Sequence, residues 1–281
     1  LDRLTKSKTD ESSPVWSPDG TRIAFTSDHT ADPDRETSVQ IYVAEAKAGA
    51  TEKQVTPFSS RGGRGAPEWS PDGKTLAFLE TDQKEVDSYS MGHLTIVPSD
   101  GSSAPTRVKA AEDLDRGVGD LHFSLDGKFI YFFVTDDRSV YPARASQSGA
   151  IVEKLLSPPV VTGSWSWAKD RVALISGGDS KANEGDASET GKLRQLTHQN
   201  EKLFVGLDLP TTEDVGFPSP DGTEVHGLLT YPVGYVKGTK VPLLLRIHGG
   251  PNGQDQHSGR SHGQMFAEHG HPVLAGNYPG G

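Results

Sequence analysis

The chain has 281 residues and a net charge of −10, with 33% hydrophobic residues, 23% charged residues and no cysteine. This length exceeds what one small hydrophobic core needs, so two domains are expected. Acidic and basic residues are mixed without a basic patch, which argues against a nucleic-acid partner, and the lack of cysteine excludes disulfides and thiolate chemistry.

The sequence carries no membrane or targeting signal. No run approaches the roughly 18 apolar residues that predict a membrane-spanning helix, so no membrane partner is expected. The first residue is Leu1 rather than Met, and no signal-like segment follows, so this end is interpreted as processed or trimmed. The compartment is left open, with the cytoplasm favoured.

A repeat organises the first part of the chain. Its copies cover residues 13–27 (SPVWSPDGTRIAFTS), 66–81 (APEWSPDGKTLAFLET), 120–135 (DLHFSLDGKFIYFFVT) and, in a degenerate form, 163–176 (GSWSWAKDRVALIS). An aromatic residue precedes each of the first three turns, at Trp16, Trp69 and Phe123. We predict that these aromatic side chains pack as core between units.

Each copy contains a turn followed by short strands. In Ser-Pro-Asp-Gly, proline supplies the φ of about −65° that a type I turn needs, aspartate bonds to its own backbone, and glycine closes the turn without steric cost. Strands are predicted at residues 22–25, 40–43, 74–78, 93–97 and 139–141, with short closing strands at 54–56 and 195–197.

Four short strands in each unit match one blade of a β-propeller. We therefore predict about four blades in residues 1–205, as part of a larger ring. Residues 1–5 are similar to the closing strand of a preceding blade. A polar run, 181–187, stands where an apolar strand is expected, so the fourth blade is predicted to be incomplete or poorly ordered.

A different pattern begins at residue 206. Residues 216–232 predict an antiparallel hairpin, and the apolar run 241–247 is typical of a central strand covered on both faces. A helix is predicted over 261–270, ended by Gly270, and another strand over 272–277. This order predicts that residues 206–281 are the truncated start of an α/β-hydrolase domain.

The stretch LLLRIHGGPNG, residues 243–253, predicts a buried strand that runs into a glycine-rich loop. In α/β-hydrolases an HGG-type loop after an early strand supplies one backbone N–H of the oxyanion hole. Glycine is needed because a side chain blocks the approach to the tetrahedral oxygen, and such a donor stabilises the transition state by about 3 kcal/mol. A tight turn without function is the alternative.

These motifs, in this order, resemble the prolyl oligopeptidase family of serine peptidases, particularly its acylaminoacyl-peptidase branch. The residues that carry the resemblance are the WSPDG repeats, SPDGTEVHGLLTYP, PLLLRIHGGPNGQ and the NY-x-G end. The resemblance implies a propeller that admits only short peptides and a hydrolase domain that cuts them. It also implies that Gly250 donates the oxyanion N–H, that Gly249 and Pro251 shape the loop, and that His248 supports it.

The catalytic serine of this family lies in a Gly-x-Ser-x-Gly elbow beyond the region that corresponds to Tyr278. The chain stops before that region, so nucleophile, acid and base are not identified, and the chain alone is expected to be inactive. One match to the pattern places Ser261 at its centre, but a polar segment precedes it where an elbow needs a buried strand. A triad of Ser261, Glu268 and His271 is therefore only a minor alternative, and Ser261 is expected to belong to the following helix.

Histidines cluster in the last part of the chain, at His248, His257, His262, His269 and His271. No acidic or thiolate partner completes a known metal pattern, so no metal and no cofactor are expected, and the histidines are predicted to be solvated or capping.

The sequence thus predicts a serine-type peptidase that acts on short peptides through an acyl-enzyme. A dipeptidyl-peptidase role is less favoured, because the Glu-Glu pair of that branch is missing. The alternative is a propeller interaction module with a vestigial hydrolase segment. A second copy of the chain or a complementary C-terminal fragment is left open as a partner.

Overall fold

The computed structural model describes residues 4–33, 38–56, 63–81, 91–148, 151–169, 171–188, 193–250, 252–259 and 261–278, without the side chains of Ser261 and His262. These residues form mostly strands, with the short helices α1 (Lys109–Glu112), α2 (Glu201–Phe204) and α3 (Ser261–Glu268). None of the described helices has the length and apolar content that crossing a membrane requires.

The chain divides into two compact units. The first comprises Leu1–Val134 and Pro142–Lys154, and the second comprises Thr135–Tyr141 and Leu155–Gly281. The second unit therefore holds the fourth repeat together with everything that follows it. The boundary at residues 205 and 206 that the sequence predicts stays a prediction.

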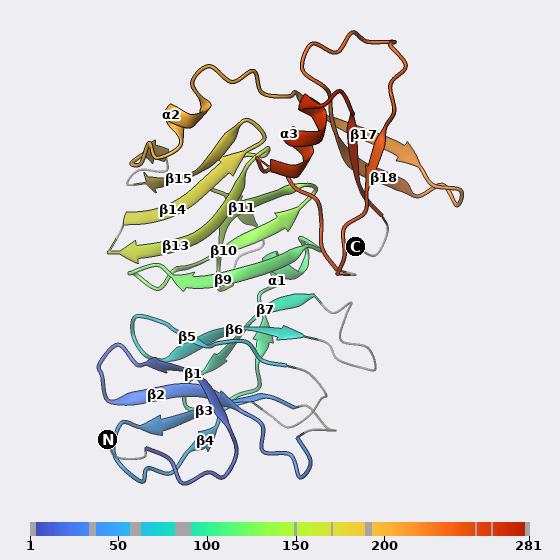
Figure 1. The fold of residues 1–281 in the computed structure, drawn as a ribbon. Helices are drawn as coiled ribbons and strands as arrows, with labels where there is room; N and C mark the ends of the chain where they lie inside the picture. The colour runs from blue at the N-terminus through green and yellow to red at the C-terminus, as the bar shows by residue number, and fades with distance from the viewer. Residues whose placement is uncertain are drawn as a thin grey trace. The chain divides into compact units, whose positions relative to one another are not determined.

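The first two repeats each form a four-stranded antiparallel sheet with the strands in chain order (Figure 1). The strands are β1 (Glu11–Trp16), β2 (Arg22–Ser27), β3 (Gln40–Glu45), β4 (Lys53–Gln54), β5 (Glu68–Trp69), β6 (Thr75–Thr81), β7 (Gly92–Pro98) and β8 (Thr106–Arg107). The strands predicted at residues 22–25, 40–43, 74–78 and 93–97 are confirmed.

The third and fourth repeats are also built from consecutive strands. These are β9 (Gly117–Phe123), β10 (Phe129–Asp136), β11 (Ser139–Ser146), β12 (Val152–Lys154), β13 (Val161–Ala168), β14 (Arg171–Gly178), β15 (Lys181–Ser188) and β16 (Leu193–Gln195). Within the second unit, Val140 of β11 pairs in parallel with Val161 of β13, and β13 to β16 continue as an antiparallel sheet.

The Ser-Pro-Asp-Gly turns form as predicted. The Ser17 hydroxyl donates to the Asp19 carboxylate at 2.6 Å, Thr21 N–H donates to the same carboxylate at 3.0 Å, and Gly20 adopts φ +70°. The Ser17 hydroxyl, followed by the Thr21 groups, lowers the pKa of Asp19 to about 2. Equivalent serine-to-aspartate bonds recur at Ser70 and Ser124.

The aromatic residue of the repeat is core in two of its three positions. Trp69 and Phe123 are 6% and 3% exposed, and Trp69 donates from Nε1 to the carbonyl of Val15 in β1 at 3.2 Å. The prediction is wrong for Trp16, which is 63% exposed. Trp69 packs against residues of the preceding sheet, β1–β4. The described residues include no sheet before β1–β4 that would cover Trp16 in the same way.

The prediction that the fourth repeat is incomplete or poorly ordered is wrong. The polar run 181–187 forms β15 and completes a four-stranded arrangement. Its two acidic side chains are buried with partners: Asp186 accepts from Ser176 at 2.5 Å, and Glu184 accepts from the Thr197 hydroxyl and from Asn200 N–H at 2.9 Å. These bonds, the Thr197 one first, lower the pKa of Glu184 to about 2. Hydrogen bonding thus replaces apolar burial in this strand.

The last part of the chain forms a mixed sheet with the order β17-β18-β20-β19. Its strands are β17 (Thr212–Pro218), β18 (Glu224–Thr230), β19 (Leu244–Arg246) and β20 (Val273–Asn277). The hairpin β17–β18 is antiparallel, β18 and β20 are antiparallel, and β19 and β20 are parallel. The predicted hairpin, helix and final strand are confirmed, and Gly270, with φ +85°, lies just after α3.

The apolar run 241–247 is not a covered central strand. Only β19 forms within it, and β19 pairs with β20 alone, as an edge strand. Leu243, Leu245 and Ile247 are 53%, 63% and 73% exposed. The run is apolar enough for two-sided burial, but among the described residues nothing covers this face.

Candidate active site

The glycine loop, residues 248–253, follows the parallel edge strand β19. Arg246, the last residue of β19, pairs with Ala275 of β20, and the chain then leaves the sheet. The prediction that a strand leads into this loop is confirmed. Pro251 lies outside the described residues.

Gly250 occupies a position that accepts no side chain. A Cβ atom there would lie 2.5 Å from the carbonyl oxygen and 2.7 Å from the nitrogen of Asn252. At Gly249 the same atom would meet nothing within 4 Å. Both glycines are exposed, and in the described part of the chain neither N–H donates to a backbone carbonyl. Among the described residues, no backbone carbonyl therefore occupies these two adjacent amides.

His248 lies at the start of the glycine loop with its ring buried, 8% exposed. It stacks on the ring of Tyr278, with centroids 4.5 Å apart and an interplanar angle of 12°. Its Nδ1 donates to the carbonyl of Gly249 at 3.2 Å, and the Tyr278 hydroxyl donates to the carbonyl of His248 at 3.0 Å. Nε2 of His248 is buried without a hydrogen-bond partner among the described residues.

The far side of the glycine loop is anchored at Asp255. Asp255 N–H donates to Asn277 Oδ1 at 2.7 Å, and Asn277 Nδ2 donates to the carbonyl of Asp255 at 3.1 Å. The Asp255 carboxylate is 1% exposed and accepts from Arg246 Nε at 3.1 and 3.2 Å. Arg246, Asp255 and Asn277 were missed by the sequence analysis; the adjacency of Asn277 and Tyr278 in the NY-x-G end was the available signal.

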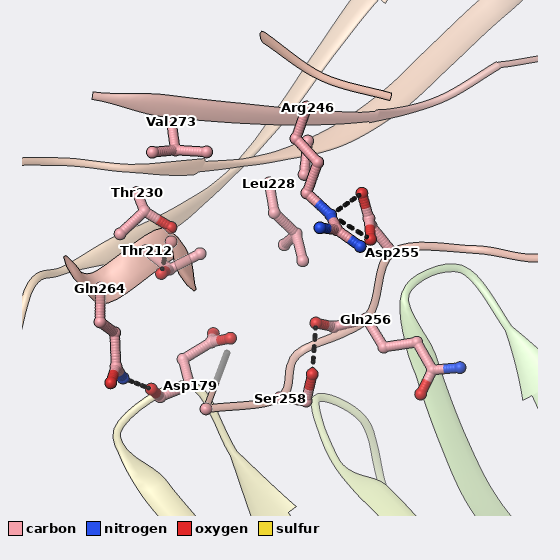
Figure 2. A pocket seen from close by; sticks show the side chains of 13 residues that line it. Asp179, Thr212, Leu228, Thr230, Arg246, Asp255, Gln256, Ser258, Gln264 and Val273 are labelled. Carbon is pink, nitrogen blue, oxygen red and sulfur yellow. Dashed lines mark hydrogen bonds and ion pairs between the residues drawn. The ribbon is translucent and has the colours of Figure 1, made fainter. Parts of the chain in front are cut away.

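A cavity of about 370 Å³ adjoins the segment after the glycine loop (Figure 2). The side chains of Leu228 and Val273 line it from the sheet, and the Arg246–Asp255 ion pair closes one side. On another side Gln264 of α3 donates to the carbonyl of Asp179 at 3.0 Å. The cavity combines an apolar floor with a polar rim, as small-ligand sites do.

The known proteins to which this chain is similar include proteins named as peptidases. Dipeptidyl-peptidase 5 of Trichophyton equinum is 30% identical over 240 residues, which cover 80% of this chain and 32% of that protein. The solved acylaminoacyl peptidase of Pyrococcus horikoshii (orthorhombic crystal form) matches with a TM-score of 0.75 at 20% identity, over 94% of this chain and 39% of that one. An acylaminoacyl peptidase in complex with Z-Gly-Gly-Phe-chloromethyl ketone matches with a TM-score of 0.74 at 20% identity, over the same shares, 94% and 39%. The chain belongs to the prolyl oligopeptidase family of peptidases.

The structural matches show that this family member shares the fold of the matched part of those enzymes. The chain spans about 38% of the length of the first curated relatives that it matches. No family model matches the chain.

An ion-pair cluster in the second unit of this prolyl oligopeptidase-family chain joins two buried basic side chains to acidic side chains that are partly exposed. His257 is 7% exposed, and its Nδ1 and Nε2 lie 2.7 Å from Asp179 and 3.1 Å from Asp214. Arg138, 8% exposed, lies 3.4 Å from Asp214 and 2.8 Å from Asp137, and its carbonyl accepts from His257 N–H at 2.8 Å. The prediction that His257 is solvated or capping is wrong, because acidic partners distant in sequence surround it.

The cluster predicts a pH-dependent stability. The hydrogen bond to Asp179 raises the pKa of His257, and Asp214 adds to the shift against opposition from burial and from Arg138. The stabilising contribution is complete below the unfolded pKa of about 6.5 and is lost as pH rises through the higher folded pKa. His257→Gln is therefore expected to lower the free energy of unfolding more at pH 6 than at pH 9, measured by urea denaturation. His269→Gln, at an exposed histidine, serves as control, and an equal loss at both pH values contradicts the prediction.

The remaining predicted residues do not assemble into a site within the described structure. Ser261 is the first residue of α3, as expected, and the side chains of Ser261 and His262 are not described. Seven positions separate Ser261 from Glu268, about 10 Å along a helix axis, which does not favour the minor triad. Nδ1 of His269 donates to the carbonyl of Met265 at 2.8 Å. Within the described ranges, no group of three acidic, histidine or cysteine residues is arranged to hold a metal ion.

Proposed function

We propose that the protein carrying this chain is a serine-type peptidase that hydrolyses short peptides through an acyl-enzyme, and that Gly250 donates one N–H of its oxyanion hole. The observation that carries the proposal is the glycine loop: it follows a parallel strand, accepts no Cβ at Gly250 and leaves the Gly249 and Gly250 amides without a backbone carbonyl acceptor among the described residues. The peptidase names of the relatives support the reaction class.

In the proposed reaction a serine oxygen attacks the scissile carbonyl carbon while its proton passes to a general base, which later gives that proton to the leaving amine, and the carbonyl oxygen becomes an oxyanion. An amide held 2.7–3.1 Å from that oxygen stabilises it without reorganisation. The intermediate collapses as the leaving amine takes a proton, and water then hydrolyses the acyl-enzyme. This proposal assigns to residues of the chain only the oxyanion donor Gly250 and its supports Gly249 and His248.

We also propose the finer architecture implied by the family. The four repeats would be propeller blades, and the sheet of β17, β18, β20 and β19 would begin an α/β-hydrolase domain. The parallel pair β19–β20 and the exposed apolar side chains of residues 243–247 support a sheet that continues beyond β19. The interaction-module alternative is not favoured, because the relatives are peptidases.

The substrate class has two candidates. The name acylaminoacyl peptidase, carried by structural neighbours, supports a substrate with a blocked amino terminus for this protein. The name dipeptidyl-peptidase 5, carried by relatives, supports a substrate with a free amine. The purified protein should be tested on N-acetyl-aminoacyl and on free dipeptidyl p-nitroanilides. We expect hydrolysis of at least one class and its loss after treatment with a serine-directed fluorophosphonate. A protein inactive on both classes, or active but resistant to the reagent, contradicts the proposal.

Residues 1–281 by themselves are expected to show no p-nitroanilide hydrolysis above buffer. The physical reason is that Ser261 begins α3 after a polar segment, and nothing among the described residues projects it from a buried strand. The same assay on the Ser261→Ala variant is the control. Turnover by the chain that disappears in this variant shows that the nucleophile lies here after all.

A further inference from the structure

The two residues that end β20 and follow it contact the two sides of the glycine loop. Tyr278 bonds to His248 before the glycines, and Asn277 bonds to Asp255 after them. We propose that Tyr278, acting directly and through the His248 ring, is a positioning residue that orients the Gly249 and Gly250 N–H groups, with Asn277 anchoring the other end. This inference rests on the proposed function of the loop as an oxyanion hole.

The peptide that joins His248 to Gly249 is held at its carbonyl oxygen. A trans peptide is planar, and its carbonyl and N–H point in opposite directions. The Tyr278 hydroxyl donates to the carbonyl of His248 at 3.0 Å. Because that carbonyl is held, the N–H of Gly249 must point to the opposite side.

The next peptide, between Gly249 and Gly250, is held in the same way. Its carbonyl accepts from His248 Nδ1 at 3.2 Å, so the N–H of Gly250 is oriented in the same way. A carbonyl only accepts, so this bond places the ring proton on Nδ1. The His248 ring can do this only while its plane is fixed, and stacking on Tyr278 at 4.5 Å and 12° fixes it. Tyr278 therefore determines the orientation of two successive peptides.

The need for such a device follows from the glycines themselves. Glycine adopts more backbone conformations than any other residue, so a glycine pair without restraints rotates its peptides readily. Oxyanion stabilisation requires donors that are oriented before the reaction. Asn277 restrains the loop where the glycines end, through its two bonds to Asp255, whose carboxylate is in turn held by Arg246.

The test uses Tyr278→Phe, which keeps the ring stack and removes the hydroxyl, and Tyr278→Leu, which removes both, in the protein that carries this chain. We expect kcat to fall about tenfold in the first and further in the second, with KM within about twofold. Binding of a peptide boronate, which forms the tetrahedral adduct, should weaken by a similar factor, and binding of a product peptide should not. Tyr235→Phe, which removes a hydroxyl bonded to Thr239, is the matched control.

A second readout does not depend on activity. Backbone order parameters of Gly249 and Gly250, measured by NMR relaxation of their amides, should be lower in both Tyr278 variants than in the parent protein, with the unfolding midpoint of Tyr278→Phe within a few degrees of the parent. If the parent protein hydrolyses no peptide but these order parameters fall in the variants, the proposed function fails and the orienting role stands. If Tyr278→Phe keeps both the parent kcat and the parent order parameters of these two amides, the inference is overturned.

Discussion

Replacing Gly250 with alanine is expected to lower kcat for peptide hydrolysis by about 10²- to 10³-fold, the loss observed when one oxyanion donor is removed. The added Cβ would lie 2.5 Å from the Asn252 carbonyl oxygen, a distance that forces the backbone to move. The displaced Gly250 N–H then no longer meets the tetrahedral oxygen. Since the interaction develops mainly in the transition state, KM should change far less than kcat.

Steady-state kinetics on the preferred p-nitroanilide of the protein tests this expectation. Gly119→Ala is the matched control, because a Cβ at this glycine in β9 meets nothing within 4 Å. Gly249→Ala, where the same space is open, should lose much less activity than Gly250→Ala. A Gly250→Ala protein that folds normally and keeps its kcat would falsify the assignment of this amide to the oxyanion hole.

Phe78→Ala is expected to cost about 3–5 kcal/mol of unfolding free energy, the range for large-to-small changes of a buried phenylalanine. Phe78 in β6 is 0% exposed and belongs to a core cluster drawn from the first two sheets, with Ala24, Ile41, Val43, Val55, Trp69, Leu76 and Val97. Both the lost apolar burial and the cavity left behind contribute to this cost.

Urea denaturation followed by tryptophan fluorescence measures the change. The comparison variant is Leu203→Ala in α2, where the side chain is 68% exposed and the expected change is within about 0.5 kcal/mol. A loss below about 1 kcal/mol for Phe78→Ala would show that the cluster is not a tightly packed core in the protein.

Local patterns were sufficient where short-range chemistry decides the structure. The Ser-Pro-Asp-Gly turns, the strands that follow them, the hairpin β17–β18 and α3 all appear at the predicted places. A turn depends on the φ preferences and side-chain bonds of four adjacent residues, which the sequence displays directly.

Burial was the weaker prediction. The polar strand β15 forms because its two buried acidic side chains accept hydrogen bonds, Glu184 from Thr197 and Asn200, and Asp186 from Ser176. A strand that is stabilised in this way shows no alternation of apolar residues in its sequence, so the hydrophobic pattern did not predict it. The apolar run around β19 is exposed because burial of a strand depends on what covers it rather than on its own composition.

For the candidate site, contiguous residues were enough to predict the glycine loop, the strand before it and the family resemblance. The contacts of Tyr278 with His248 and of Asn277 with Asp255, and the distant acidic partners of His257, could be seen only in the folded chain. Such contacts join residues separated by 22 or more positions, as Asp255 and Asn277 are. The contacts of Tyr278 and Asn277 form only when β19 and β20 pair and bring the two ends of the loop beside the end of β20.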